Sequence, residues 1–150
     1  MTLVFGVLVV TYSDANGGGN TDTGFVAELL EKNYHVFETF YELKKERIAE
    51  ILADSMAERI QMLVNGQRPV AINGSLTYSA DQRIEALFRQ FLDANEMSIL
   101  AAKFGFTLSA AANAGVNHRK LHPYAQANKA RPAFIDSGLF RSSARVWTEQ

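Results

Sequence analysis

The 150-residue chain contains no cysteine, only three prolines and no long hydrophobic run. Without thiols, disulfides and thiolate metal sites are excluded, and a reducing compartment is compatible with this composition. The apolar stretch at residues 3–10 is far shorter than the roughly 20 residues that cross a bilayer. A secretion signal has Lys or Arg before its apolar stretch, and neither residue precedes this one. We therefore expect a soluble, unprocessed protein that makes no contact with a membrane.

The composition is that of an ordinary globular protein, and the length favours a single domain over residues 1–150. Charge, however, is distributed unevenly along the chain. The net charge is −1, yet residues 1–96 hold 8 Lys and Arg against 14 Asp and Glu, whereas residues 97–150 hold 7 against 2. Opposite-signed halves suit head-to-tail contact between copies in a ring, or docking onto an acidic neighbour. Pairing of the two halves within one monomer is the alternative. The positive excess alone is too small to indicate nucleic-acid binding.

The N-terminal part of the sequence predicts a strand, a loop and two helices. Residues 3–12 are rich in Val, Leu and Phe, which predicts a buried strand. Residues 14–23 are rich in Gly, Asn and Asp, which predicts a flexible loop that a partner could order. The residues that we expect to be ordered in this way are Asp14, Asn16, Gly17, Gly18 and Gly19. A helical pattern over residues 25–64 is weakest at Asn33 and Tyr34, so we expect a short helix followed by a long one.

The long helix should run from about Val36 to Asn65 and Gly66, where glycine supplies the left-handed conformation that ends a helix. Apolar residues recur along it at three- and four-residue steps, opposite a charged face. At a rise of 1.5 Å per residue, some 28 residues span about 42 Å, which is long for a domain of this size. Such a helix needs apolar cover beyond a small core, which favours an oligomer.

The C-terminal part predicts further helices and strands. Asn73-Gly74 between β-forming residues predicts a hairpin. Ser79 and Gln82 have the spacing of a capping box and would open an amphipathic helix. We also expect a short alanine-rich helix at residues 109–114, an irregular basic stretch at 116–132, a helix beginning at Asp136, and a strand at 145–148. The fold class is therefore α+β, with a small antiparallel sheet packed against one long helix and two or three shorter ones.

The glycine-rich loop lacks the complete pattern of a nucleotide or calcium site. Phe25 and Val26 stand where a phosphate-binding loop needs Lys and Ser or Thr, and Asp22 occupies the last glycine position of the dinucleotide motif. The acids and amides of the loop also lack the EF-hand spacing. We therefore expect no cofactor there.

Histidine and serine motifs are likewise incomplete. His118 and His122 are four residues apart, as in a helical zinc site, but Pro123 argues against a helix and no Glu lies between them. No Ser-His-Asp pattern and no nucleophile elbow is present. We therefore expect no metal, no catalytic residue and no enzymatic activity.

The basic stretch mixes cations with one aromatic residue, which suits contact with acidic protein or with phosphates; a solvated loop is the alternative. Its candidate interface residues are Arg119, Lys120, His122, Tyr124, Lys129 and Arg131.

Three blocks near the C-terminus carry a family resemblance. They read Gly115-Val116-Asn117-His118-Arg119, His122-Pro123-Tyr124-Ala125, and Arg131-Pro132-x-Phe134-Ile135-Asp136-Ser137-Gly138-Leu139. They resemble small neck, tail-completion and head–tail joining proteins of tailed phages. The resemblance also includes the upstream segments Ile84-Glu85, Phe88-Arg89-x-Phe91-Leu92 and Glu96-Met97, and in all it covers about a third of the chain. That family often ends in an Asp-Thr-Gly-Leu helix start followed by a strand; here Ser137 replaces the threonine and keeps the hydroxyl.

The resemblance implies a non-enzymatic virion protein, assembled in the host cytoplasm, that forms a homo-oligomeric ring between the portal-side connector and the tail. Its implied partners are further copies of itself, other connector, collar and tail proteins, and DNA passing through the ring. Pro132, Phe134, Asp136, Ser137, Gly138 and Leu139 would set the helix start that docks the last strand. The alternatives are a tail terminator ring that caps the tail tube and, less favoured, a small nucleotide- or nucleic-acid-binding domain.

Overall fold

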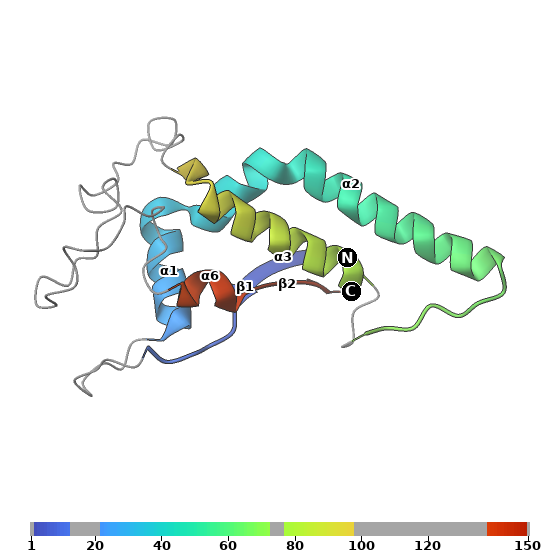
Figure 1. Ribbon diagram of the computed structural model, residues 1–150, viewed down its shortest axis with the longest axis horizontal. Helices are drawn as coiled ribbons and strands as arrows, with labels where there is room; N and C mark the ends of the chain where they lie inside the picture. Colours follow the sequence, from blue (N-terminus) through green and yellow to red (C-terminus); the bar gives the residue numbers. More distant parts are fainter. Residues whose placement is uncertain (1, 13–21, 73–76, 98–137, 150) are drawn as a thin grey trace, which may run out of the picture.

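The computed structural model describes residues 2–12, 22–72, 77–97 and 138–149. Their elements follow in the order β1 (Thr2–Val7), α1 (Thr23–Tyr34), α2 (Val36–Val64), α3 (Tyr78–Asp93), α6 (Leu139–Ser143) and β2 (Ala144–Glu149). In Figure 1 the molecule is elongated: α2 forms one long edge, α3 lies beside its first half, and the two strands run along α3. This arrangement confirms the predicted α+β class, with a small antiparallel sheet and one long helix.

The start of α1 is fixed to the segment that follows β1. Asp22 caps the helix, because its carboxylate accepts a hydrogen bond from the backbone N–H of Phe25 at 2.8 Å. Next to it, the buried hydroxyl of Thr23 donates to the carbonyl of Leu8 and accepts from the N–H of Val10. The extended segment after β1 is thereby held against the first turn of α1.

α1 and α2 are separate helices because the chain turns at His35, whose backbone is left-handed with φ of 50°. The first N–H groups of α2 would otherwise lack partners. Glu31 supplies one, since its carboxylate accepts from the N–H of Phe37 at 2.7 Å and of Glu38 at 3.3 Å. The predicted division into a short and a long helix is confirmed, with the break within two residues of its expected place.

The long helix ends as expected, whereas the next helix begins earlier than expected. Gly66 has a φ of 74°, which confirms its role after the last turn of α2. The predicted capping box of Ser79 and Gln82 is wrong, because α3 begins at Tyr78 and places Ser79 within its first turn. Thr77 is the N-cap residue instead, and its hydroxyl donates to the carboxylate of Asp81 at 3.3 Å.

The predicted final helix, in contrast, begins later than expected. α6 starts at Leu139, three residues after Asp136, which itself lies outside the described residues. The reason is the backbone of Gly138, whose φ of 76° is left-handed and cannot belong to a right-handed helix. The strand predicted at residues 145–148 is confirmed as β2, one residue longer at each end.

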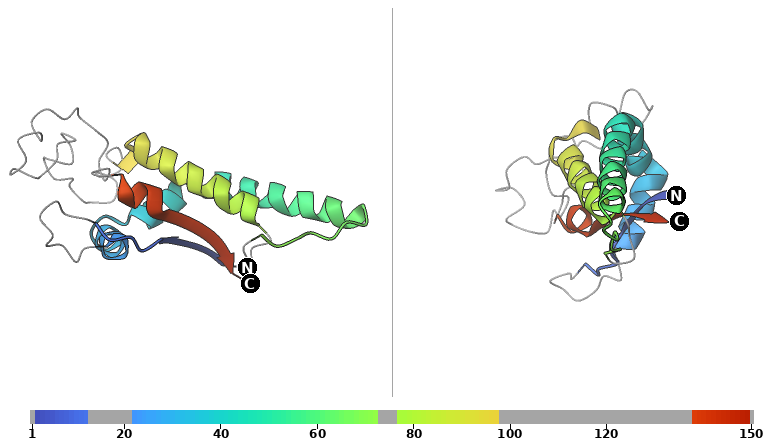
Figure 2. Two further views of the ribbon diagram at one scale, coloured as in Figure 1. Left: turned by 60° about the horizontal axis from the view of Figure 1, so that its bottom comes forward. Right: turned by 90° about the vertical axis from the view of Figure 1, so that its right-hand side faces the viewer.

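The two ends of the chain meet in the sheet, as the side-by-side strands in Figure 2 show. β1 and β2 are antiparallel, with register from Thr2↔Glu149 to Val7↔Ala144. The ladder continues with a bond of 2.8 Å from the N–H of Leu8 to the carbonyl of Ser143. The predicted N-terminal strand is thus confirmed for its first part, and the chain leaves the strand at Leu8. An isolated pair of strands is marginally stable, so the sheet depends on the helices that cover it.

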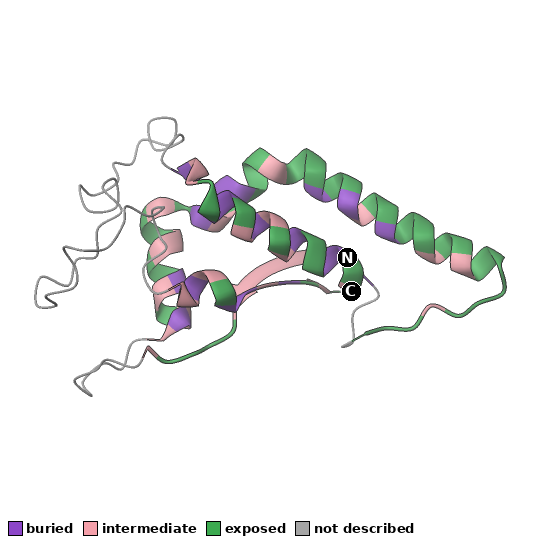
Figure 3. Cartoon of the chain, viewed as in Figure 1, coloured by how far each residue is buried: buried purple, intermediate pink, exposed green. Residues whose placement is uncertain are grey.

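The core is built mainly from phenylalanine rings. The ring centroids of Phe40 and Phe88 lie 5.1 Å apart in an edge-to-face arrangement, and Phe37 stacks on Phe88 at 5.2 Å. Around these rings lie Phe5 from β1, Phe91 from α3 and Phe140 from α6. Figure 3 shows that the buried residues of α2 lie along its side facing α3 and become sparse toward its C-terminal end. One cluster therefore holds the helices and both strands together, and it extends along α2 as far as Ile51 and Leu52.

Some predicted elements cannot be compared with the structure. The turn Asn73-Gly74 and the short helix at 109–114 lie outside the described residues.

Truncating the ring at the centre of the cluster should be costly. We predict that Phe88→Ala lowers the free energy of unfolding by about 3–5 kcal/mol, because Phe88 is 1% exposed and its removal leaves a cavity. Urea denaturation followed by circular dichroism measures this change. The matched control Phe25→Ala, at a ring 58% exposed, should change it by less than about 1 kcal/mol. Equal losses for both variants would contradict the placement of the core.

Candidate functional site

The C-terminal end of α2 and the segment after it carry exposed apolar side chains, which we call the tip surface. Its members, each between 49% and 74% exposed, are Met56, Ile60, Leu63, Val64, Val70 and Ile72. On α2 they follow four-residue steps on a side rotated away from the buried Ile51 and Ser55. The guanidinium of Arg59 donates to the carbonyl of Val70 at 3.3 Å, which ties the returning segment to the helix.

A second apolar group surrounds the start of α1, and we call it the heel surface. Its members, between 41% and 71% exposed, are Leu8, Val9, Val10, Phe25 and Leu29. Phe25 and Leu29 lie one turn apart on the outer side of α1, opposite the buried Thr23 and Ala27.

The two surfaces lie at opposite ends of the molecule. In Figure 1, α1 and the segment after β1 occupy one end of the long axis, and the end of α2 occupies the other. Neither surface can therefore cover the other within one chain. Soluble monomers rarely leave large contiguous apolar patches exposed, and patches of this kind mark sites of interaction. The long helix predicted from the sequence, α2, does extend beyond the core. Its apolar residues were expected on a single face, but in the structure some of them face the core and others are exposed.

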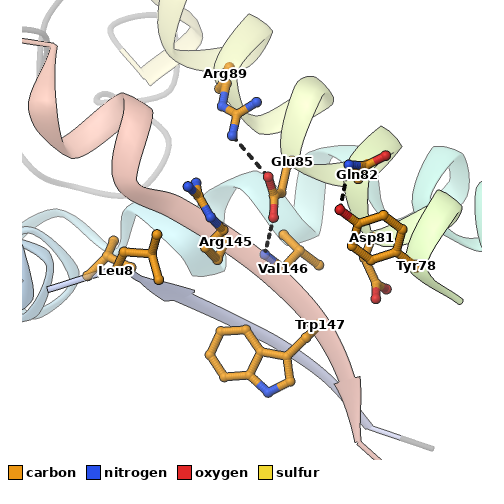
Figure 4. A pocket seen from close by; sticks show the side chains of 10 residues that line it. Leu8, Tyr78, Asp81, Gln82, Glu85, Arg89, Arg145, Val146 and Trp147 are labelled. Atoms are coloured by element: carbon orange, nitrogen blue, oxygen red, sulfur yellow. Dashed lines mark hydrogen bonds and ion pairs between the residues drawn. The ribbon is translucent and has the colours of Figure 1, made fainter. Parts of the chain in front are cut away.

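A groove of about 640 Å³ runs between β2 and α3. Figure 4 shows the side chains around it, with Glu85 and Arg89 on one wall and Arg145 and Trp147 on the other. The complete lining consists of Val7, Leu8, Tyr78, Asp81, Gln82, Glu85, Arg89, Arg145, Val146 and Trp147.

Glu85 uses both of its carboxylate oxygens in this groove. One oxygen accepts from the backbone N–H of Val146 at 3.2 Å, and the other accepts from the guanidinium of Arg89 at 2.9 Å. The N–H of Val146 points away from β1, because the antiparallel pattern directs alternate residues outward. Glu85 therefore takes the place of a neighbouring strand on the open edge of β2 and fixes the sheet to α3.

Trp147 lies across the outer face of the sheet. A Cβ added at Gly6 would come within 2.7 Å of the indole ring, so the absence of a side chain at Gly6 lets the ring lie flat on β1. Because the indole is still 38% exposed, it forms part of the surface rather than of the core.

Glu31, His35 and Glu38 place three potential metal ligands within 4.8 Å of one another. Each already has a structural partner: the Glu31 carboxylate caps α2, and His35 Nδ1 lies 2.9 Å from a Glu38 oxygen. Glu31 is partly buried, His35 and Glu38 are exposed, and the helix junction accounts for the whole group.

One ion pair joins the acidic and basic halves of the sequence in the described part of the chain. Arg141 from α6 contacts both carboxylate oxygens of Asp93 at the end of α3, with 2.7 Å from Nε. This hydrogen bonding to Asp93 raises the pKa of Arg141. This contact is therefore a pairing of the acidic and basic halves within one monomer, which was predicted from the sequence as the alternative to contact between copies.

Most of the residues singled out in the sequence lie outside the described part of the chain. They comprise the interface residues Arg119, Lys120, His122, Tyr124, Lys129 and Arg131, the motif residues Pro132, Phe134, Asp136 and Ser137, and the loop residues Asp14, Asn16, Gly17, Gly18 and Gly19. Of the motif, Gly138 and Leu139 are described: Gly138 is the N-cap residue of α6 and Leu139 is its first residue. The tip and heel surfaces were not predicted from the sequence. The apolar residues on more than one side of the long helix could have indicated the tip surface.

In comparisons with family models, curated proteins and solved structures, no match to this chain was found. Within the described residues, every helix is too short or too polar to span a membrane.

The role of Glu85 at the edge of β2 leads to a testable difference between two variants. Glu85→Ala should lower the free energy of unfolding by about 1–3 kcal/mol, because it leaves the nearly buried N–H of Val146 without a partner. Glu85→Gln retains an acceptor oxygen and should lose less. Amide hydrogen exchange measures the effect locally: protection of Val146 should fall in Glu85→Ala and persist in the control Glu58→Ala. Unchanged protection of Val146 in Glu85→Ala would show that another group holds this edge.

Proposed function

We propose that this chain is a structural protein of the head–tail junction of a tailed phage, where copies of it form a ring that joins the connector to the tail. In this role it acts by binding and has no enzymatic activity. Its location would be the virion, and its partners would be further copies, connector, collar and tail proteins, and DNA in the ring lumen.

The observation that carries this proposal is the projecting end of α2. The core covers the first half of the helix, where Phe40 and Ile48 are buried, whereas Ile60 and Val64 are 60% and 74% exposed. An exposed apolar helix end stabilises nothing in an isolated chain. It gains stability only when a neighbouring molecule removes it from water. A protein made to assemble accounts for this arrangement more directly than an enzyme does.

The chemistry of the groove also supports a binding role. Its central acid, Glu85, has a structural partner at each oxygen, Arg89 at one and the backbone N–H of Val146 in β2 at the other, as expected of a residue that holds the sheet to α3. The resemblance of the C-terminal blocks to neck and tail-completion proteins, together with the described Gly138-Leu139 helix start, directs the proposal to the head–tail junction.

The proposal is tested in the phage whose genome carries the gene. We predict that its deletion leaves DNA-filled heads and separate tails, because the part that joins them is missing, and that expression from a plasmid restores joined particles. Negative-stain electron microscopy distinguishes these products, and cryo-electron microscopy of intact particles should show the chain as a ring between connector and tail.

Purified particles that lack the protein would contradict the proposal, as would normal joined particles from the deletion strain. A ring seated only on the end of the tail tube would instead identify the tail terminator alternative.

A further inference from the structure

We propose that the tip surface of one copy binds the heel surface of the next, so that the chain assembles head to tail. This inference rests on the proposed function, which supplies a ring, and it adds which two faces of the subunit meet. The tip surface comprises Met56, Ile60, Leu63, Val64, Val70 and Ile72, and the heel surface comprises Leu8, Val9, Val10, Phe25 and Leu29.

The two apolar surfaces lie at opposite ends of one elongated subunit (Figures 1 and 3). A contact between two different surfaces of identical subunits is heterologous, and repeating it generates a ring when the rotation closes. A contact of tip with tip would join two copies only, and it would leave the heel surface of each uncovered.

Side chains of opposite charge surround the two surfaces. Around the heel, the described residues 22–33 hold Asp22, Glu28, Glu31 and Lys32, which leaves an acidic excess. Around the tip, residues 58–72 hold Glu58, Arg59 and Arg68, which leaves a basic excess. Among the described residues neither Glu28 nor Arg68 forms an ion pair. Opposite signs at the rims favour contact of tip with heel and oppose contact of a surface with itself.

Contacts within the subunit hold both surfaces in place. The tip is set on the end of a continuous helix, and Arg59 fixes the segment that carries Val70 to it. The heel is held by the hydroxyl of Thr23, which bonds to the backbone of Leu8 and Val10. Both surfaces are therefore ordered before they meet, so little conformational entropy is lost in the contact.

The test uses one variant at each surface, each with a charge that the opposite surface should repel. Leu63→Asp places an acid at the tip against the acidic heel, and Phe25→Lys places a base at the heel against the basic tip. The matched controls are Tyr41→Asp and Leu43→Lys, which lie at exposed positions of α2 outside both surfaces. The mass of each purified full-length protein is measured by size-exclusion chromatography with light scattering at concentrations up to about 1 mM.

We expect the unmodified chain and both controls to form species larger than a dimer, and each surface variant alone to be a monomer. An equimolar mixture of the Leu63→Ser and Phe25→Ser variants should give a heterodimer and nothing larger, because only one intact tip and one intact heel remain to pair and the two altered surfaces carry no opposite charges. Circular dichroism and thermal unfolding verify the folding of each variant. If a charged variant does not fold, Leu63→Ser and Phe25→Ser provide the same test.

Three results would overturn the inference: an unmodified chain that is monomeric at about 1 mM, a single surface variant that still dimerises, or a mixture that remains monomeric. A monomeric chain whose Leu63→Asp variant nevertheless blocks particle assembly would assign the tip to a different virion protein. The two proposals fail separately. Head-to-tail assembly of a chain absent from phage particles would contradict only the function, and a virion ring with other contacts would contradict only the surfaces.

Discussion

The packing of phenylalanine rings between α2, α3 and the sheet is the interaction on which the rest of the structure depends. Phe40 and Phe88 at its centre are almost completely buried, and rings from β1 and α6 close around them. This cluster brings the first and last elements of the chain together, so that β1 and β2 can pair although they are separated by nearly the whole sequence. Two strands alone bury too little apolar surface to be stable, and the phenylalanine rings on the helices supply the additional buried surface.

The limited extent of this core explains the exposed surfaces. The core cluster extends along α2 as far as Ile51 and Leu52, and beyond Ser55 the apolar side chains of Met56, Ile60, Leu63 and Val64 are exposed. The helix nevertheless continues without interruption to Val64, because its sequence holds neither glycine nor proline until Gly66. Each exposed apolar side chain there contributes favourably only when it leaves water. In the proposed head-to-tail assembly, both this surface and the one around α1 would be covered.

Much of the architecture could be predicted from the sequence, because local patterns determine it. The periodicity of α2, the left-handed Gly66 and the β-forming residues of the last strand are local signals, and each gave the observed element. The late start of α6 came from the local backbone of Gly138, whereas other failures came from contacts between residues distant in sequence. Thr77 rather than Ser79 begins α3, and Thr77 also hydrogen-bonds to Thr148 in β2. Glu85 bonds to the edge of β2, and Trp147 lies on Gly6; neither pairing has a local sequence pattern. The tip and heel surfaces became visible only when the size of the core was known.

The absence of cysteine from the chain permits a direct test of whether tip and heel meet. Ile60→Cys and Phe25→Cys would be introduced singly and together, and each protein treated with a short bismaleimide at assembling concentration. The account predicts a ladder of covalent multimers from the double variant and only monomers from each single variant, because every contact joins one tip to one heel. Covalent dimers from a single variant, or monomers alone from the double variant, would contradict it.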